Sequence, residues 1–238
     1  VMPLILELSG NDAAIVREDA DLEMAARGIA SGTFARAGQI CIRIKRVFVH
    51  EEVASELTER VVDIAAGLRR EDVGPLIREE ARRKVDRVVR DAVANGAELL
   101  HGGRDWEGPG FFYEPTVLTV QDQRSEVVRR ETFGPVCPIQ AVKDDEEAIQ
   151  LANDTPYGLG ATIWTSDYDA GESLAKRLEV GNVWINDCIR TLPCGELFQG
   201  WKQSGIPSSQ RRLEMFAKKR TVITRRSCDA RPTWFGGA

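Results

Sequence analysis

Short apolar runs alternate along this chain with longer stretches in which apolar residues recur at helical spacing. The apolar runs predict strands over residues 3–8, 43–50, 113–120, 135–142, 160–165 and 181–186, and a last, exposed strand over 221–225. The amphipathic stretches predict helices that end near residues 36, 68, 95, 153 and 178, the first with Asp19 or Asp21 as its N-cap. Strands that alternate with helices predict an α/β fold in which helices cover a sheet.

Composition narrows the class of protein. The 238 residues are 42% hydrophobic and 29% charged, as in a soluble globular protein. The net charge of −5 argues against nucleic acid as the main partner. No apolar run approaches the ~18 residues that a membrane span needs, and no export leader is apparent. We therefore expect neither a nucleic-acid nor a membrane partner.

The five cysteines are scattered and never form a C-x-x-C pair. This spacing predicts a reduced, cytoplasmic protein without structural disulfides. The two histidines, His50 and His101, lie far in sequence from other metal ligands, so we expect no metal site and no Cys-His dyad. From residue 208 onward basic residues become more frequent, and the last residues are aromatic and rich in glycine. That tail is either a frayed terminus or an arm that docks on a neighbouring subunit.

Cys41 and Glu7 are the candidate catalytic residues. Each lies near glycine, Cys41 between a predicted helix and strand and Glu7 at the end of an apolar run. A thiolate can attack a carbonyl carbon, and a carboxylate with a raised pKa can activate water to release the acyl group. Each also has a plain interpretation: Cys41 as an inert buried thiol, and Glu7 as a carboxylate facing water. The residues alone leave both interpretations open.

Five ordered segments of this chain resemble signature segments of the aldehyde dehydrogenase superfamily. Leu6–Ala13 is similar to the glutamate signature, and Phe34–Ile42 is similar to the cysteine signature. Glu131–Val136 resembles a Glu-x-Phe-Gly-Pro segment, and Ala152–Leu159 resembles Asn-x-Thr-x-Tyr-Gly-Leu. Phe198–Gly205 resembles Phe-Gly-Gly-x-Lys-x-Ser-Gly, with Gln199 in place of a glycine. The resemblance extends over nearly the whole chain.

The resemblance implies a three-layer α/β fold, with helices on both faces of the sheet, over residues 1–207, followed by the tail 208–238. It also implies an aldehyde substrate, oxidised to a carboxylic acid with NAD or NADP, and a homo-oligomer. Cys41 would be the nucleophile and an oxyanion donor through its N–H, and Glu7 the base for deacylation. Glu131 would bind the nicotinamide ribose, and Phe133 would pack beside the nicotinamide.

Several departures from the family pattern leave alternatives open. Arg43 stands where the pattern prefers a small residue, which predicts a crowded site, and residues 68–77 look shortened. The family's dinucleotide-binding half and a G-x-G-x-x-G turn are not found in this sequence, so we expect incomplete cofactor binding. The alternative is a truncated, non-catalytic homologue that serves as an oligomerisation or interaction module. A CoA-acylating relative fits less well, because Glu7 supplies a base for water.

Overall fold

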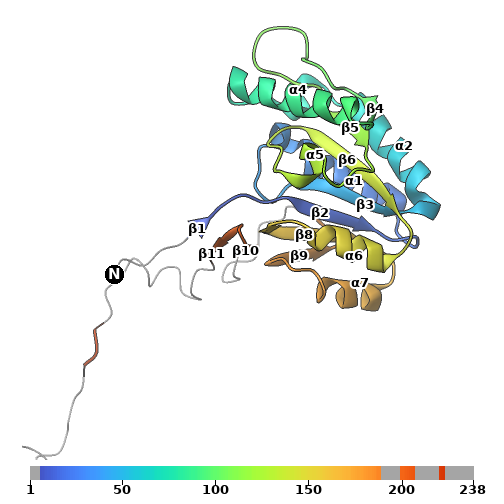
Figure 1. The fold of residues 1–238 in the computed structure, drawn as a ribbon, viewed down its shortest axis with the longest axis vertical. Helices are drawn as coiled ribbons and strands as arrows, with labels where there is room; N and C mark the ends of the chain where they lie inside the picture. Colours follow the sequence, from blue (N-terminus) through green and yellow to red (C-terminus); the bar gives the residue numbers. More distant parts are fainter. Residues whose placement is uncertain (1–5, 189–198, 207–219, 223–238) are drawn as a thin grey trace, which may run out of the picture. The chain divides into compact units, whose positions relative to one another are not determined.

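A seven-stranded sheet forms the centre of the computed structural model, which describes residues 6–188, 199–206 and 220–222. The strand order is β4 (Glu98–His101), β5 (Thr116–Thr119), β6 (Val136–Val142), β3 (Ile44–His50), β2 (Asp12–Val16), β8 (Gly160–Trp164) and β9 (Asn182–Ile185) (Figure 1). All neighbours are parallel except β4, which runs antiparallel to β5. Every residue of β2 and β8 is buried, as expected for parallel strands covered on both faces.

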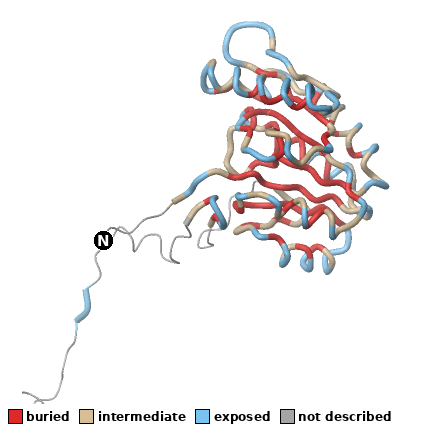
Figure 2. The backbone as a smooth tube through the Cα atoms, viewed as in Figure 1, coloured by how far each residue is buried: buried red, intermediate tan, exposed pale blue. Residues whose placement is uncertain are grey.

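Helices cover both faces of this sheet. Alternate residues of β2 show the division: Ala14 and Val16 pack with α1 (Leu22–Phe34) and α2 (Glu51–Gly67), whereas Ala13 and Ile15 pack with α6 (Asp145–Asn153) and α7 (Tyr168–Ala175). A third cluster packs α4 (Glu79–Ala94) and α5 (Glu126–Arg129) beside β5 and β6. Figure 2 shows the buried strands between helices whose outer faces are exposed. The three-layer α/β fold predicted from the sequence is confirmed.

Two small sheets lie outside the main one. β1 (Leu6–Glu7) pairs antiparallel with β11 (Gly205–Ile206), and β7 (Tyr157–Gly158) pairs antiparallel with β10 (Trp201–Lys202). A short helix α3 (Arg70–Val73) and a 3-10 helix over Ala35–Gly38 complete the described elements. The chain divides into one compact unit over Leu4–Ser208 and a second that combines residues 1–3 with 209–238. Of the second unit, only 220–222 are described, without a helix or strand.

The predicted helices are all present, and side chains cap the first turns of several of them. Asp21 accepts a hydrogen bond from the backbone N–H of Met24 and caps α1, and Asp144 caps α6 in the same way through Glu147. In the main sheet, two strands, β2 and β4, have no counterpart in the prediction, and the short strands β7, β10 and β11 were not predicted either. The strand predicted over 3–8 is confined, within the described part, to Leu6–Glu7, and Leu8 is exposed. The strand predicted over 221–225 falls mostly outside the described residues.

Candidate active site

Cys41 lies in a strained connection between α1 and β3. The backbone is left-handed at three consecutive residues, with φ of 54° at Arg36, 54° at Ala37 and 71° at Gly38. For a residue with a Cβ this conformation costs about 1–2 kcal/mol, and such strain gathers at functional sites. A Cβ on Gly38 would lie 2.2 Å from the carbonyl oxygen of Gly134, so only glycine fits there. The glycine of the cysteine segment thus permits close contact with the segment that contains Glu131.

Side-chain hydrogen bonds fasten this connection on two sides. Gln39 accepts from the backbone N–H of Ile77 at 2.9 Å and donates to the carbonyl of Pro75 at 3.1 Å. Arg43 is fully buried, and its guanidinium donates to the carbonyls of Ile44 at 2.8 Å, Val136 at 3.1 Å and Thr132. Arg43 was expected to crowd the site. In the structure its guanidinium instead holds the loop before β6.

Gly10 brings the glutamate segment against Cys41. A Cβ at Gly10 would lie 2.6 Å from the carbonyl oxygen of Cys41, so the two backbones are in close contact. The N–H of Gly10 also donates to Oε1 of Glu131 at 3.3 Å. Gly10, Cys41 and Glu131 precede β2, β3 and β6, which are parallel. The first three signature segments therefore meet at the N-terminal edge of the sheet.

Lys45 is buried in the middle of this cluster. Its side chain is only 1% exposed, and its Nζ lies 3.2 Å from Oε1 of Glu131 and 2.6 Å from the carbonyl oxygen of Cys41. Burial lowers the pKa of Lys45 to about 8, and the charges of Asp12 and Glu131 oppose that shift. The ammonium form therefore predominates at neutral pH.

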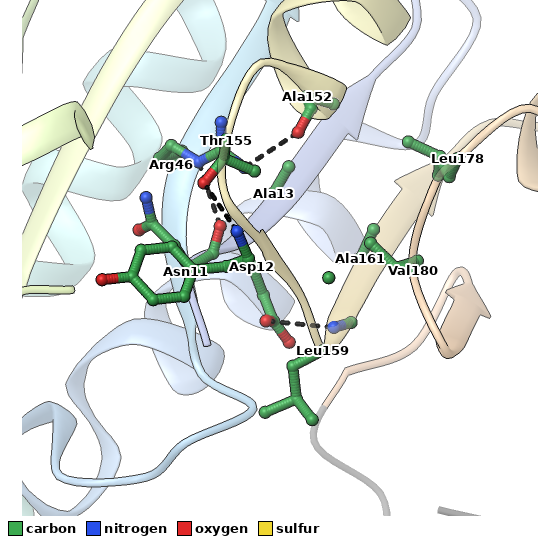
Figure 3. A pocket seen from close by; sticks show the side chains of 13 residues that line it. Asn11, Asp12, Ala13, Arg46, Ala152, Thr155, Leu159, Ala161, Leu178 and Val180 are labelled. Carbon is green, nitrogen blue, oxygen red and sulfur yellow. Dashed lines mark hydrogen bonds between the residues drawn. The ribbon is translucent and has the colours of Figure 1, made fainter. Parts of the chain in front are cut away.

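Asp12 adds a second carboxylate to the same edge, and this one is buried. Its Oδ1 accepts from the N–H of Gly160 at 3.1 Å (Figure 3), and its Oδ2 is buried without a hydrogen-bond partner. Burial raises the pKa of Asp12 to about 6, although Lys45 and the Gly160 hydrogen bond lower it. Figure 3 also shows Arg46, which donates to the carbonyls of Asn11 and Ala152 and so ties β3 to β2 and α6.

The Cys41 thiol is half-buried. Burial raises its pKa, and this effect exceeds the opposing effects of Lys45 and of hydrogen bonds from the backbone N–H groups of Ile42 and Cys41. The thiol is therefore mostly protonated at neutral pH in the described chain. Cys137 is fully buried, and burial raises its pKa to about 12. Cys194 and Cys228 lie outside the described residues.

Glu7 lies in β1, three positions before Gly10. Its backbone pairs with Gly205, and the N–H of Leu8 donates to the carbonyl of Ser204 at 3.0 Å. The Glu7 side chain is exposed, so of the two interpretations that the sequence left open, the structure shows a carboxylate at a strand end and not one in apolar surroundings. The glutamate segment is thus held between the fifth signature segment at one end and Cys41 at the other.

Phe133 and Thr132 line a surface cavity, and Glu131 precedes them in the chain. The Phe133 ring is 42% exposed, and beside it lies a cavity of about 360 Å³. Its lining combines apolar groups with the polar side chains of Gln39, Arg78, Glu80 and Lys84. The carboxylate of Glu131 is partly exposed next to Phe133. A ligand with an aromatic ring and polar substituents fits a surface of this composition.

The last two signature segments pack on each other. The N–H of Gly158 donates to the hydroxyl of Ser204 at 2.9 Å, and Lys202 Nζ donates to the carbonyl of Asn153 at 2.8 Å. The backbone carbonyl of Gln199 accepts from Asn182 at 2.9 Å, so the residue that departs from the pattern forms a backbone contact there. These segments form the β7–β10 pair and place Gly160, which binds Asp12.

Lys45 and Asp12 were not singled out from the sequence. A signal for Lys45 exists: three cations, Arg43, Lys45 and Arg46, occur at the start of a strand that is otherwise apolar. Asp12 likewise opens an apolar run, Asp12–Val16, in which a carboxylate must be buried. Within the described ranges, no group of three or more His, Cys, Asp or Glu is placed to hold a metal ion, and no helix is long and apolar enough to cross a membrane.

The fold and this cluster define a class: an α/β protein with a candidate cysteine nucleophile at the N-terminal edge of a parallel sheet. The model of the aldehyde dehydrogenase family matches residues 1–222. The chain is 40% identical over 209 residues to an Escherichia coli succinate semialdehyde dehydrogenase whose name specifies NAD(P)+, covering 85% of this chain and 45% of that protein. It is 39% identical to a Bacillus subtilis betaine aldehyde dehydrogenase, covering 87% and 44%. This chain belongs to the aldehyde dehydrogenase family.

A solved structure shows the same fold. Betaine aldehyde dehydrogenase from Staphylococcus aureus, in complex with NAD+, superimposes with a TM-score of 0.82 at 32% identity. The match covers 88% of this chain and 44% of that one. The chain thus spans less than half the length of these relatives.

Proposed function

We propose that this chain is the catalytic portion of an NAD(P)-dependent aldehyde dehydrogenase, with Cys41 as nucleophile and Glu7 as base. The observation that carries the proposal is the meeting of the glutamate, cysteine and Glu131 segments through the Gly10–Glu131 and Lys45–Cys41 hydrogen bonds. Residues 1–207 form the catalytic domain, and 208–238 form an arm that contacts another subunit.

Cys41 starts the reaction. Its thiolate attacks the aldehyde carbon, forming an S–C bond, and the carbonyl oxygen becomes an oxyanion held by the Cys41 N–H. Loss of hydride from the same carbon then leaves a thioester on Cys41. Because burial raises the pKa of Cys41, the thiol must lose its proton before attack.

The residues near Phe133 fit the nicotinamide end of the cofactor. The exposed Phe133 ring and the cavity beside it suit a flat ring, and the Glu131 carboxylate, already aligned by Gly10 and Lys45, suits ribose hydroxyls. NAD or NADP, when bound, supplies the hydride acceptor. Arg78 and Lys84 outnumber the single carboxylate of Glu80 in the same cavity, which favours phosphate oxygens there.

Glu7 completes the reaction. As a carboxylate it removes a proton from water, the water oxygen attacks the thioester carbon, and the S–C bond breaks to give a carboxylic acid and the free thiol. Its exposed side chain on β1 is accessible to water.

Ester hydrolysis without cofactor tests this assignment. It needs only the thiol, the oxyanion donor and the base. With 4-nitrophenyl acetate, Cys41→Ala should abolish both the burst and the steady rate, whereas Glu7→Gln should keep the burst and lose turnover. Cys188→Ala, at a half-buried thiol that donates to the Gly28 carbonyl, is the matched control and should retain both. Equal hydrolysis by the Cys41→Ala variant would contradict the proposal and favour a non-catalytic interaction module.

We extend the proposal to assembly and location. Leu8 and Trp201 are 51% and 46% exposed, and both belong to or adjoin the small sheets, so a second subunit would cover apolar surface there. Cys41 and Cys137 are free thiols, in keeping with a cytoplasmic protein. Sedimentation of the purified chain as a monomer would argue against the homo-oligomer.

A further inference from the structure

Lys45 has three acceptors for its three N–H donors. Its Nζ lies 2.6 Å from the carbonyl oxygen of Cys41, 3.2 Å from Oε1 of Glu131 and 3.5 Å from the carbonyl oxygen of Ile40. An ammonium group has three N–H bonds and no acceptor. The buried side chain therefore has one preferred orientation, in which every proton is used.

Two of these acceptors belong to the peptide units on either side of the Cys41 Cα. The Ile40 carbonyl shares its peptide unit with the N–H of Cys41, and the Cys41 carbonyl shares its unit with the N–H of Ile42. Both of those N–H groups lower the pKa of the Cys41 thiol, so they favour its thiolate. Lys45 thus lies at the carbonyl ends of the same two peptide units whose N–H ends favour the thiolate.

This arrangement lets a positive charge act through the backbone. A hydrogen bond from an ammonium to a carbonyl polarises the peptide unit and strengthens the donor at its other end. The surroundings keep Lys45 charged: Asp12 and Glu131 favour the ammonium, while burial and Arg43 oppose it. Asp12 faces Lys45 from β2, Glu131 from the loop before β6, and Arg43 and Cys41 from its own strand and connection.

We propose that Lys45 is a positioning residue for the Cys41 nucleophile, which holds and polarises the two N–H groups that stabilise the thiolate. For the aldehyde reaction, which rests on the proposed function, the same interaction orients the Cys41 N–H toward the oxyanion. Lys45 itself need not touch the substrate.

The pH dependence of Cys41 alkylation tests this role without any turnover. The full chain is treated with limiting iodoacetamide from pH 6 to 10, and labelling of the Cys41 peptide is followed by mass spectrometry. At pH 7, where Lys45 is an ammonium, Lys45→Met should be alkylated about tenfold more slowly than the wild type, and the difference should shrink above pH 8, where Lys45 loses its proton. Lys45→Arg, which keeps the charge, should restore much of the rate at pH 7. A merely structural role would slow a folded variant by the same factor at every pH.

Controls separate this effect from misfolding. Cys137, fully buried, should stay unlabelled in every folded variant, and Lys143→Met, at an exposed lysine, should leave the Cys41 profile unchanged. Because Lys45→Met leaves two carboxylates without their cation, Lys45→Met is also made in an Asp12→Asn background and compared with Asp12→Asn alone. A rate at pH 7 that is unchanged in both backgrounds, or that is slowed equally at every pH, overturns the proposal. Slowing confined to low pH in a chain that hydrolyses no ester upholds it while the proposed function fails.

Discussion

The backbone N–H of Gly10 donates to the carboxylate of Glu131 at 3.3 Å, across 121 positions of the sequence. The same glycine is in close contact with the carbonyl of Cys41. One residue without a side chain therefore brings the three segments of the candidate site together. The contact fixes the Cys41 carbonyl, which is also the acceptor for Lys45.

Gly10→Ala should disturb both folding and the site. The added Cβ would meet the Cys41 carbonyl at 2.6 Å and a Leu159 methyl at 2.8 Å, and the backbone contact cannot be relieved by a rotamer change. We expect a loss of about 1–3 kcal/mol in the free energy of unfolding, measured with urea.

Gly67→Ala is the matched control for this prediction. Gly67 ends α2, and a Cβ there meets no atom within 4 Å. Alanine in that position should be neutral or stabilise by about 0.5–1 kcal/mol, because glycine loses more backbone entropy on folding. Equal losses in the two variants would contradict the close-contact explanation.

Much of the fold could be predicted because its helices and most strands have clear periodicity. The strand β2 was missed for a physical reason. Its run Asp12–Val16 begins with a carboxylate and two alanines, which have low strand propensity, and only its central place in the sheet makes it a strand. The edge strand β4 was missed because its Glu98 and Leu99 are exposed and pair only with β5.

The candidate site was only partly predictable. Cys41 and Glu7 carry recognisable segments, but the burial of Lys45 depends on which strands flank β3, and no local pattern encodes that order. Arg43 shows the same limit: its partners Thr132 and Val136 lie about ninety positions away, with separations of 89 and 93. Arg43 was expected to crowd the site because its sequence neighbours do not reveal that the loop before β6 packs against it.

Arg43→Met should be strongly destabilising. The substitution removes the donors that satisfy three buried carbonyls while it keeps much of the apolar volume. Each buried acceptor left unpaired costs about 1–3 kcal/mol, so we expect a loss of several kcal/mol, on the order of 3 or more, in urea unfolding. Arg43→Lys should rescue little, because an ammonium lacks the planar fork.

Arg124→Met serves as the control for that loss. The Arg124 side chain is 91% exposed and pairs only locally with Asp122. Its removal should change the free energy of unfolding by no more than about 0.5 kcal/mol. If Arg43→Met were equally mild, the buried hydrogen bonds of Arg43 would not hold the loop before β6.

Asp12 should make stability depend on pH with an unusual sign. Its pKa is about 6 in the fold against 3.8 in the unfolded chain, so the native state binds more protons than the unfolded state between these values. Its contribution therefore falls as pH rises from 4 toward 7. Asp12→Asn resembles the protonated acid. Its free energy of unfolding should therefore rise, relative to that of the wild type, by on the order of 2–3 kcal/mol between pH 4 and 7.

Asp72→Asn checks this sign. Hydrogen bonds from Arg69 hold the pKa of the exposed Asp72 below its usual value of 3.8. Its contribution to the free energy of unfolding is therefore nearly complete above about pH 5 and is lost at lower pH. The difference between Asp72→Asn and the wild type should be flat from about pH 5 to 7. Parallel curves for the two variants would show that Asp12 is not buried with a raised pKa.

Cys41 should be alkylated far faster than Cys137 in the native chain. Both thiols have pKa values raised by burial, but Cys137 is fully buried with a pKa of about 12, whereas Cys41 is half-buried and has Lys45 and two N–H groups to offset the shift. With limiting iodoacetamide at pH 8, peptide mass spectrometry should show Cys41 labelled at least ~100-fold faster. In 8 M urea the two rates should become similar, since both thiols then meet solvent with ordinary pKa values near 8.5. Similar rates without urea would contradict this explanation. They would mean that Cys41, in the connection from Ala35 to Arg43, is no more accessible to solvent than Cys137 in β6.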